Sequence, residues 1–349
     1  MSVKFTIPSL SLALLAATST VHAGGLDRVA FNSNILFEKG NYAKFTFSKT
    51  DPKVAPTAAP NNSVASSFNS ARLEYKHQFT DAFAVAILLN NDPIGADINY
   101  TGLGTQLIGN IDAASAALLG KYSFNDNFSV YGGLKYQRVE AVADLTAVGG
   151  TALNFGSERE LGYIAGIAYE RKDIALRVAL SYESRIDYSL PTSAVAGGGV
   201  LGNTTAATPA AFTLDFQTGV APKVLVFGSI RRALWSDANI TLPAALGGTS
   251  LSDFRDTTNY TLGVGYKLND QWSFSGALNY EPTTGGIISP FAPANGIRGV
   301  SLGAKYTQDT YDVSFGVRYS ERGDVVTALG TPFSGSTVLT TGVSVGFRF

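Results

Sequence analysis

Most of the chain alternates between an apolar residue and a small or polar one, in runs of about ten residues. In the last ten residues, TTGVSVGFRF, one face carries Val343, Val345, Phe347 and Phe349, and the other carries glycine, serine and arginine. A period of two is that of a β-strand. The apolar face contains no Asp, Glu, Lys or Arg in the six clearest runs, which are 161–169, 174–182, 260–268, 272–280, 311–319 and 339–349.

Short turns alternate with long connections along the whole chain. Two hairpins, ALLGKYSFNDNFSVYGGLKY and TLGVGYKLNDQWSFSGALNY, are near copies that each turn within three polar residues. Four further short turns are expected at TDA (80–82), KD (172–173), PK (222–223) and DT (309–310). Seven connections rich in Gly, Pro, Thr and Ala lie between them, near residues 50–67, 91–112, 143–156, 189–209, 236–255, 283–297 and 327–337. These thirteen connections predict fourteen strands.

This pattern predicts an all-β fold, a single 14-stranded antiparallel transmembrane β-barrel over residues 41–349. Brief turns on one side and long loops on the other are typical of outer-membrane barrels. Aromatic residues such as Tyr260 and Trp272 gather at strand ends, where interfacial girdles belong. A soluble β-sandwich could also alternate, but it does not need aromatic residues at the strand ends. We expect the strand that ends in Phe349 to close the barrel against the first strand.

The composition and the first residues agree with export to the outer membrane. Charged residues make up 15% of the 349 residues against 45% hydrophobic, with 37 Gly, 16 Tyr and 21 Phe, which is low in charge for a soluble domain. Lys4, an apolar stretch and the small-residue site at 21–23 predict a signal peptide over residues 1–23. The stretch is shorter than the roughly 20 residues of a membrane-spanning helix. We therefore expect a multi-pass protein of the bacterial outer membrane whose mature chain begins at Gly24.

The rare residue types argue against an enzyme. Zero Cys and two His, one of them in the predicted leader, leave no thiolate or histidine cluster for a metal. Two stretches, 299–303 and 342–346, match the hydrolase pattern G-x-S-x-G, but both lie in alternating strands with no His downstream. The formal net charge of -1 gives no reason to expect nucleic acid as a partner. We expect no catalytic residue, no metal site and no cofactor.

Two stretches resemble a known family. These are GGLDRVAFNSNILFEKGNYAKFTFSKTDPKVAP at the start of the mature chain and LDFQTGVAPKVLVFGSIRRALWS at 214–236, and both resemble the outer-membrane long-chain fatty-acid transporter family, FadL type. The resemblance implies transport of hydrophobic compounds through a barrel plugged by an N-terminal hatch. It also implies capture of the cargo by outer loops and sideways release at a kinked third strand. The hatch would be residues 24–40, with Phe31, Leu36 and Phe37 in it.

Two connections, predicted as outer loops at 141–155 and 189–207, are unusually apolar and correspond to the family's capture groove. The expected ligand-binding residues are Leu145, Val148, Leu153, Phe155, Leu190, Val195, Val200 and Leu201. Exposed apolar loops must pack together or hold a hydrophobic ligand, and the sequence alone leaves both open. Fatty acids, aromatic hydrocarbons and other lipid-like compounds all remain candidate cargoes.

The predicted hatch is short. Seventeen residues, 24–40, precede the first predicted strand, and the family's Asn-Pro-Ala hatch motif is absent. A short hatch can leave the barrel partly open. A porin-like passive diffusion channel for small solutes therefore stays an alternative function.

The predicted lateral gate lies in NNDPIGAD (90–97), where the third strand loses its alternation. Pro93 has no N–H for the strand ladder and Gly95 tolerates unusual backbone angles, so Asn90, Asn91, Pro93 and Gly95 are the expected gate residues. The stretch can equally be the top of a strand that turns into a loop. The expected partners are a hydrophobic small molecule, membrane lipid and the outer-membrane assembly machinery, and we expect the barrel to be a monomer.

Overall fold

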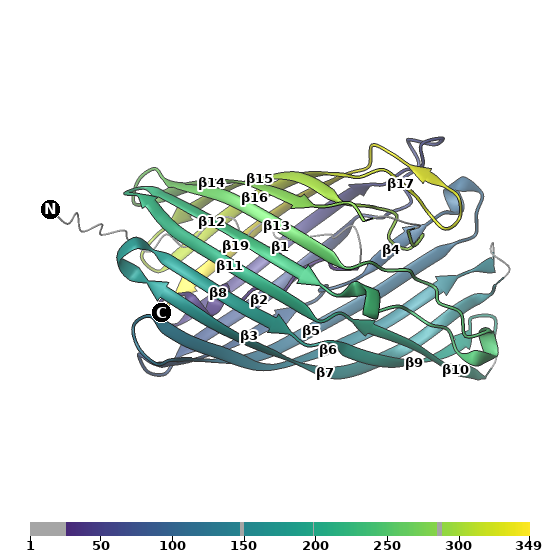
Figure 1. The fold of residues 1–349 in the computed structure, drawn as a ribbon, viewed down its shortest axis with the longest axis horizontal. Coiled ribbons are helices and arrows are strands. Elements are labelled where there is room, and N and C mark those ends of the chain that lie inside the picture. Colours follow the sequence, from purple (N-terminus) through teal and green to yellow (C-terminus); the bar gives the residue numbers. More distant parts are fainter. Residues whose placement is uncertain (1–25, 147–149, 198, 285–287) are drawn as a thin grey trace.

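The computed structural model describes residues 26–146, 150–197, 199–284 and 288–349, which form a closed antiparallel β-barrel (Figure 1). The strands are β1 (Tyr42–Lys53), β2 (Phe68–Gln78), β3 (Phe83–Asn90), β4 (Ala96–Asn99), β5 (Ile108–Ser123), β6 (Phe128–Asp144), β7 (Ala152–Arg171), β8 (Leu176–Glu183), β9 (Ile186–Ala194), β10 (Val200–Thr208), β11 (Ala211–Ala221), β12 (Val224–Ala233), β13 (Thr257–Lys267), β14 (Trp272–Glu281), β15 (Ile297–Thr307), β16 (Tyr311–Arg322), β17 (Val325–Val326), β18 (Pro332–Phe333) and β19 (Thr337–Arg348). The short 3-10 helices are η2 (Asn34–Phe37), η3 (Thr101–Leu103), η5 (Lys172–Ile174), η6 (Trp235–Asp237) and η7 (Ala244–Leu246).

Fourteen spanning strands close the barrel, which confirms the predicted fold. Three of them are built from two pieces each, β3 with β4, β8 with β9, and β10 with β11. The ring closes between the first and the last strand, because β1 pairs with β19 from Tyr42↔Arg348 to Lys53↔Thr337. Closure removes the free edges of the sheet, which the interior of a bilayer does not tolerate.

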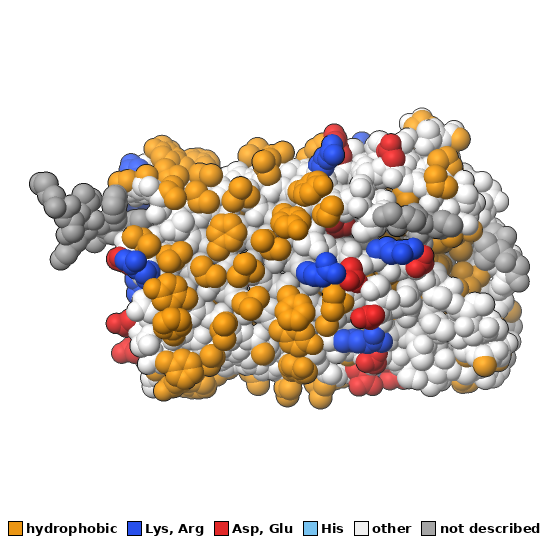
Figure 2. Space-filling model, in the orientation of Figure 1, with side chains coloured by type: hydrophobic (Ala, Val, Ile, Leu, Met, Phe, Trp, Pro, Cys, Tyr) orange, Lys and Arg blue, Asp and Glu red, His pale blue; other side chains and the backbone are white. Residues whose placement is uncertain are grey.

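The apolar face of the strands points outward, as a membrane barrel requires. Leu161, Leu278 and Phe315 are 62%, 64% and 54% exposed, although each lies in the middle of a strand. Figure 2 shows a broad band of hydrophobic side chains around the barrel, with charged side chains mostly at its two borders. At the C-terminus, the ring of Phe349 stacks on Tyr75 with the ring centroids 6.1 Å apart. The band marks the part of the barrel that lies in the bilayer.

Several strands run well beyond this band. β7 contains 20 residues and β6 contains 17, whereas a membrane strand needs about 9–11. The prediction of long loops at 141–155 and 189–207 is therefore wrong, because β6, β7, β9 and β10 continue through most of both stretches. Ala and Gly are depleted in strands, but pairing with neighbours such as Ala143↔Leu153 overrides that preference.

The N-terminal segment that precedes β1 lies inside the barrel. Asp27 forms a β-bridge with Ile94, between β3 and β4. Further along, η2 places Ile35 and Leu36 against inward-facing side chains of β3, β5 and β7, so that these two residues are 0% and 1% exposed. The segment thus crosses the lumen before the chain enters the wall at Tyr42.

Candidate functional site

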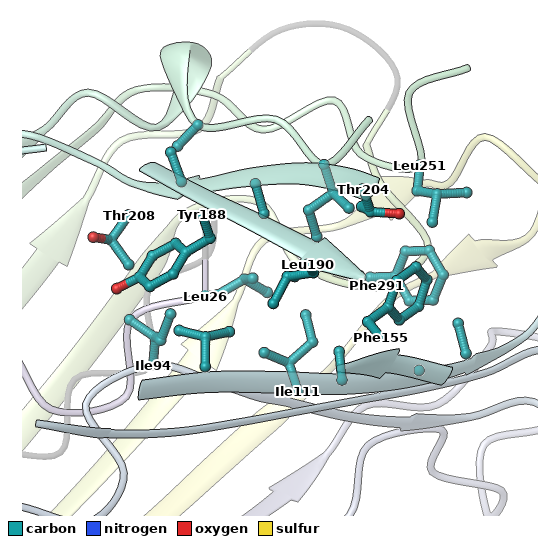
Figure 3. A pocket seen from close by; sticks show the side chains of 18 of the residues that line it. Leu26, Ile94, Ile111, Phe155, Tyr188, Leu190, Thr204, Thr208, Leu251 and Phe291 are labelled. Atoms are coloured by element: carbon teal, nitrogen blue, oxygen red, sulfur yellow. The ribbon is translucent and has the colours of Figure 1, made fainter. Parts of the chain in front are cut away.

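An apolar pocket lies inside the barrel, away from the end where the C-terminus lies (Figure 3). It is bounded by the N-terminal segment, by the inner faces of β5, β6, β7, β9 and β10, and by the connections after β12 and β14. About 650 Å³ of space lies between its lining atoms, open solvent at its mouth included. Its lining residues are aliphatic or aromatic apart from one glycine and two threonines, and none of them is charged. Such a surface binds hydrocarbon.

Small inward-facing residues create this space. Gly109 on β5, Ala141 and Ala143 on β6, and Ala206 on β10 all line the pocket. The Phe291 ring packs directly on Gly109, where an added Cβ would collide with it. The alternation of small wall residues with large residues from the connections therefore sets the shape of the pocket.

The outer connections above the pocket hold one another in place. The Tyr100 hydroxyl donates a hydrogen bond of 3.0 Å to the Pro290 carbonyl, and the Tyr100 ring meets Phe333 edge to face with centroids 6.2 Å apart. Burial raises the pKa of the Tyr100 phenol, so it remains a neutral donor. Because Pro290 directly precedes Phe291, this hydrogen bond also positions the aromatic end of the pocket.

The structure brings together half of the residues that the sequence suggested for ligand binding. Phe155 and Leu190 line the pocket, and Leu145 and Leu153 are buried in the hydrophobic cluster around it. Leu201 packs against the same cluster with part of its surface exposed. The other described residues of the set, Val195 and Val200, are 58% and 68% exposed and lie outside the pocket. Val148 lies outside the described residues.

Sequence reasoning missed most of the pocket. Leu26 and Ile94 line it from the N-terminal segment and from the stretch between β3 and β4, and Phe254 and Phe291 line it from two connections. Tyr188, on β9, directly precedes the stretch 189–207 and is not among the predicted ligand residues. One signal was present: strands such as β5 carry apolar residues on both faces, with Ile111 and Ala113 inward and Leu118 outward, and an inward apolar face must be covered.

A layer of buried ion pairs lies between the pocket and the periplasmic end of the barrel. Arg231 on β12 contacts Glu183 at 3.4 Å and Asp27 at 3.6 Å, and Lys135 contacts Glu183 at 3.2 Å. The indole N–H of Trp235 donates to Asp27 at 3.2 Å. Apolar cargo gains nothing by moving into such a layer, and it would have to separate charges that are costly to leave unpaired.

The third spanning strand is interrupted in the wall beside the pocket. The ladder between β2 and β3 ends at Arg72↔Asn90, and β4 pairs with β5 but not with β2. β-pairing across the gap resumes at the bridge Ala65↔Ile98. The stretch is therefore a break within a strand and not the top of a strand, since the strand resumes as β4.

Side chains replace the missing backbone bonds at this break. The Asn91 side-chain oxygen accepts the Ala71 N–H at 2.6 Å, and the Asn90 side-chain oxygen accepts the Asp92 N–H at 3.1 Å. The Pro93 carbonyl accepts the N–H groups of Arg28 and Val29, each at 3.1 Å. Membrane-embedded backbone groups need partners of this kind.

Arg28, from the N-terminal segment, fills the break from inside. Its guanidinium contacts Asp92 at 3.0 Å and Asp97 at 2.6 Å, and its Cζ lies 4.1 Å from the centre of the Phe68 ring. A Cβ at Gly95 would lie 2.6 Å from that Cζ and 2.8 Å from the Ile111 carbonyl oxygen. Glycine is thus required here for the close approach of Arg28, and the expected gate residues Asn90, Asn91, Pro93 and Gly95 all lie at this break.

The three expected hatch residues all lie in the lumen. Leu36 is buried, and Phe31 and Phe37 are partly buried against the same cluster. The Phe37 ring has the Lys121 Nζ 4.1 Å and the Arg177 Cζ 4.5 Å from its centre, a cation–π geometry that ties the segment to the wall.

Two further features are absent from the described residues. No helix in that part of the chain is long and apolar enough to cross a membrane. In the same residues, no three His, Asp or Glu side chains are grouped so that they could share a metal ion.

Comparison with known proteins gives one family and a set of similar folds. Residues 39–329 match the family described as outer membrane protein transport protein (OMPP1/FadL/TodX). A Pseudomonas aeruginosa FadL homologue is 18% identical, with 90% of this chain and 92% of that chain covered and a TM-score of 0.70. The Pseudomonas putida toluene transporter TodX is 17% identical, with 97% of both chains covered and a TM-score of 0.66. No curated protein sequence matches the chain.

Proposed function

Because the chain belongs to the outer membrane protein transport protein family (OMPP1/FadL/TodX), it is an outer-membrane channel for hydrophobic compounds, and we propose that it releases an uncharged cargo sideways at the break between β2 and β4. The observation that carries this proposal is the position of Ile94. This residue lines the apolar pocket and also lies in the break. A molecule held in the pocket is therefore next to the interruption of the third spanning strand.

The pocket favours uncharged cargo over ionised fatty acid. An ionised carboxylate needs several hydrogen bonds or a cation to replace its hydration, and no lining residue carries a charge. A hydrocarbon surface, by contrast, gains roughly 0.8 kcal/mol for each methylene removed from water. Of the cargo classes that the sequence leaves open, an aromatic hydrocarbon or similar compact molecule fits better than a long-chain fatty acid.

Lateral release avoids two costs. Passage straight down would move the cargo into the ion-pair layer of Asp27, Glu183 and Arg231 and then past the packed side chains of Ile35 and Leu36. Release into water would also lose the free energy that the cargo gained when its apolar surface left water. Exit through the wall delivers it into lipid, where neither cost arises. We propose that residues 24–40 act as the hatch that blocks the direct route.

A disulfide across the break tests this route. The Ser70 hydroxyl lies 3.4 Å from the Asp92 carboxylate on the other side of the break, so S70C/D92C places two thiols within reach in a chain with no other Cys. Uptake of a hydrophobic fluorophore into vesicles is expected to stop in the oxidised protein and to return on reduction, while binding in detergent persists. Full uptake by the oxidised variant would contradict lateral release.

A matched disulfide controls for stiffening of the barrel. Thr50 and Thr340 face each other across the intact pair β1 and β19, with their hydroxyl oxygens 3.1 Å apart. Oxidised T50C/T340C is expected to transport at the normal rate. Equal loss in both variants would assign the effect to general rigidity.

Ion conductance in a planar bilayer distinguishes the porin-like alternative from the proposed transport channel. A plugged barrel is expected to give little steady ion current in a planar bilayer, and a passive diffusion channel gives a large one. The packing of Ile35 and Leu36 in the lumen supports the plugged barrel. A large current from the wild-type protein would favour the porin.

We further propose that the terminal aromatic residue is read by the outer-membrane assembly machinery. Phe349 ends the closing strand and is 68% exposed, and its backbone N–H is within 3.4 Å of the Asn41 carbonyl oxygen. Deletion of Phe349 is expected to lower the amount of folded barrel in cells while export continues. Normal amounts of heat-modifiable barrel would contradict the idea.

A further inference from the structure

One end of the apolar pocket carries an unused hydrogen-bonding group. Tyr188 is 3% exposed and its ring lines the pocket, yet its hydroxyl has no hydrogen-bond partner at bonding distance. Figure 3 places Tyr188 near Ile94, with Thr208 as the other polar side chain at that end and with Phe155 and Phe291 at the opposite end. The third hydroxyl of the lining, that of Thr204, is already bonded to Thr192 at 2.7 Å.

A buried tyrosine hydroxyl normally finds a partner, because leaving it without one loses the hydrogen bonds it made to water. Thr208 is the wall side chain that acts on the Tyr188 hydroxyl, but it does not lie within hydrogen-bonding distance, so the wall does not supply that partner. We propose that the cargo supplies it, so that Tyr188 is a ligand-binding residue and the pocket takes apolar molecules that carry one uncharged oxygen substituent at one end. Phenols, alcohols and ketones belong to this class.

This inference rests on the proposed function, since it identifies the cargo of the same pocket. A phenol can place its oxygen at Tyr188 and its ring among the apolar lining residues, whereas a carboxylate would bring a full charge to a place without a cation in the lining. The nearest described cation of the ion-pair layer, Arg231, already has its charge balanced by Glu183 and Asp27. A neutral oxygen is therefore the group that the pocket can satisfy.

The position of Tyr188 also orients the cargo. Because Ile94 lies at the same end of the pocket and in the break of the third strand, a bound molecule points its oxygen toward the break and its hydrocarbon toward Phe155 and Phe291. The oxygen end would then be the first to reach the wall.

A pair of matched ligands tests the proposal. Ethylbenzene and 4-ethylphenol differ by one hydroxyl, and their affinities for the full-length protein in detergent can be measured by calorimetry or by displacement of a fluorescent hydrophobe. Tyr188→Phe keeps the ring and removes only the hydroxyl. We expect this variant to bind 4-ethylphenol roughly five- to ten-fold more weakly, the value of one hydrogen bond, and to bind ethylbenzene as well as the wild type does.

Tyr280→Phe provides the control, because Tyr280 is 46% exposed on the outer face; it is expected to leave both affinities unchanged. Unaltered binding of 4-ethylphenol by Tyr188→Phe, or an equal loss for both ligands in a variant that remains a heat-modifiable barrel, would overturn the role of Tyr188 and leave the pocket intact. Failure of the wild type to bind either ligand would instead overturn the proposed use of the pocket, and this inference with it.

Discussion

On β1, β2, β16 and β19 the side chains that face the lumen are polar, whereas on β3, β5 and β7 they are mostly hydrocarbon. The first group includes Lys44, Thr46, Ser48, Thr50, Arg72, Glu74, Asp312, Arg318 and Thr340. The second includes Ala84, Ala86, Leu88, Ile111, Ala117, Leu119, Leu153, Phe155, Ile164 and Ala168. Both groups lie in the same barrel and show a similar apolar face to the membrane, so the difference concerns only the interior.

The lumen-facing side chains of the two halves are kept from water in different ways. In the polar half, neighbouring strands satisfy one another, as in the pairs Lys44–Glu74 at 2.8 Å and Lys305–Asp312 at 3.1 Å. In the apolar half, such pairing is confined to the ends near the short turns, as in Lys121–Glu170 at 3.1 Å, so the N-terminal segment and the outer connections must cover the rest of the surface. Where they do not cover it completely, the apolar pocket remains. The pocket is therefore the part of the apolar half that neither the N-terminal segment nor the outer connections cover.

The largest effect is expected in the polar half, from Glu74→Ala. Glu74 is 1% exposed and bridges Lys44 with Arg72 at 3.5 Å, so its loss leaves two buried cations without their shared carboxylate. We expect the free energy of unfolding to fall by about 3–5 kcal/mol, measured by urea titration in lipid vesicles. Asp51→Ala, which breaks the exposed pair Lys49–Asp51, is expected to cost less than about 1 kcal/mol. Equal costs would remove the distinction between buried and exposed pairs.

Leu36→Ala tests the cover of the apolar half. Leu36 packs in a cluster with Leu88 and Leu119, and loss of its side chain is expected to weaken docking of the N-terminal segment by about 2–4 kcal/mol. The segment can leave the lumen without unfolding the wall, so we expect a higher ion conductance with a nearly unchanged urea midpoint. A conductance equal to that of the wild type would show that this segment does not block the lumen.

Gly109→Ala tests the shape of the pocket itself. Because the Phe291 ring occupies the place of the new Cβ, the ring must move, and overpacking of this kind costs about 1–3 kcal/mol. We expect weaker binding of ethylbenzene with an unchanged barrel, measured by calorimetry. Gly102→Ala, in η3 where an added Cβ meets nothing within 4 Å, tests whether any glycine substitution has this effect and should leave binding unchanged.

The smallest effect is expected from Thr50→Val, back in the polar half. This change removes the hydroxyl that pairs with Thr340 at 3.1 Å and costs about 1 kcal/mol, the net value of one hydrogen bond. The urea midpoint is expected to shift slightly, with cargo binding unaffected. A change in cargo binding would mean that the two halves of the wall are coupled.

The barrel could be predicted from the sequence because every membrane-spanning strand must present an apolar face to lipid. Alternation such as that of residues 260–268 had to be satisfied by lipid on one face, and Leu262 and Val264 are indeed exposed on the outer surface. The short turns followed from their polar residues for the same reason. The strand ends at 141–155 and 189–207 did not follow, since above the bilayer no lipid enforces the alternation.

The pocket was only half predictable. Phe155 and Leu190 lie in stretches that are apolar on their own, so composition drew attention to them. Leu26, Ile94 and Phe291 are far apart in sequence and meet only because the N-terminal segment enters the lumen and pairs with the broken strand. Tyr188 reads as one more aromatic residue in a barrel strand, and only its unpartnered hydroxyl distinguishes it.

The length of β7 has a consequence for the rate of entry. Its 20 residues extend about 66 Å along the strand, or about 50 Å along the barrel axis at a tilt of about 40°, while the apolar band of such a barrel is about 25 Å tall. One wall therefore rises about 25 Å past the hydrocarbon boundary and carries with it the part of the pocket that Phe155 lines. We expect a sparingly soluble molecule to reach this pocket directly from the aqueous phase, so that its diffusion to the rim, and not its solubility in the polar surface layer of the cell, limits how fast it is collected.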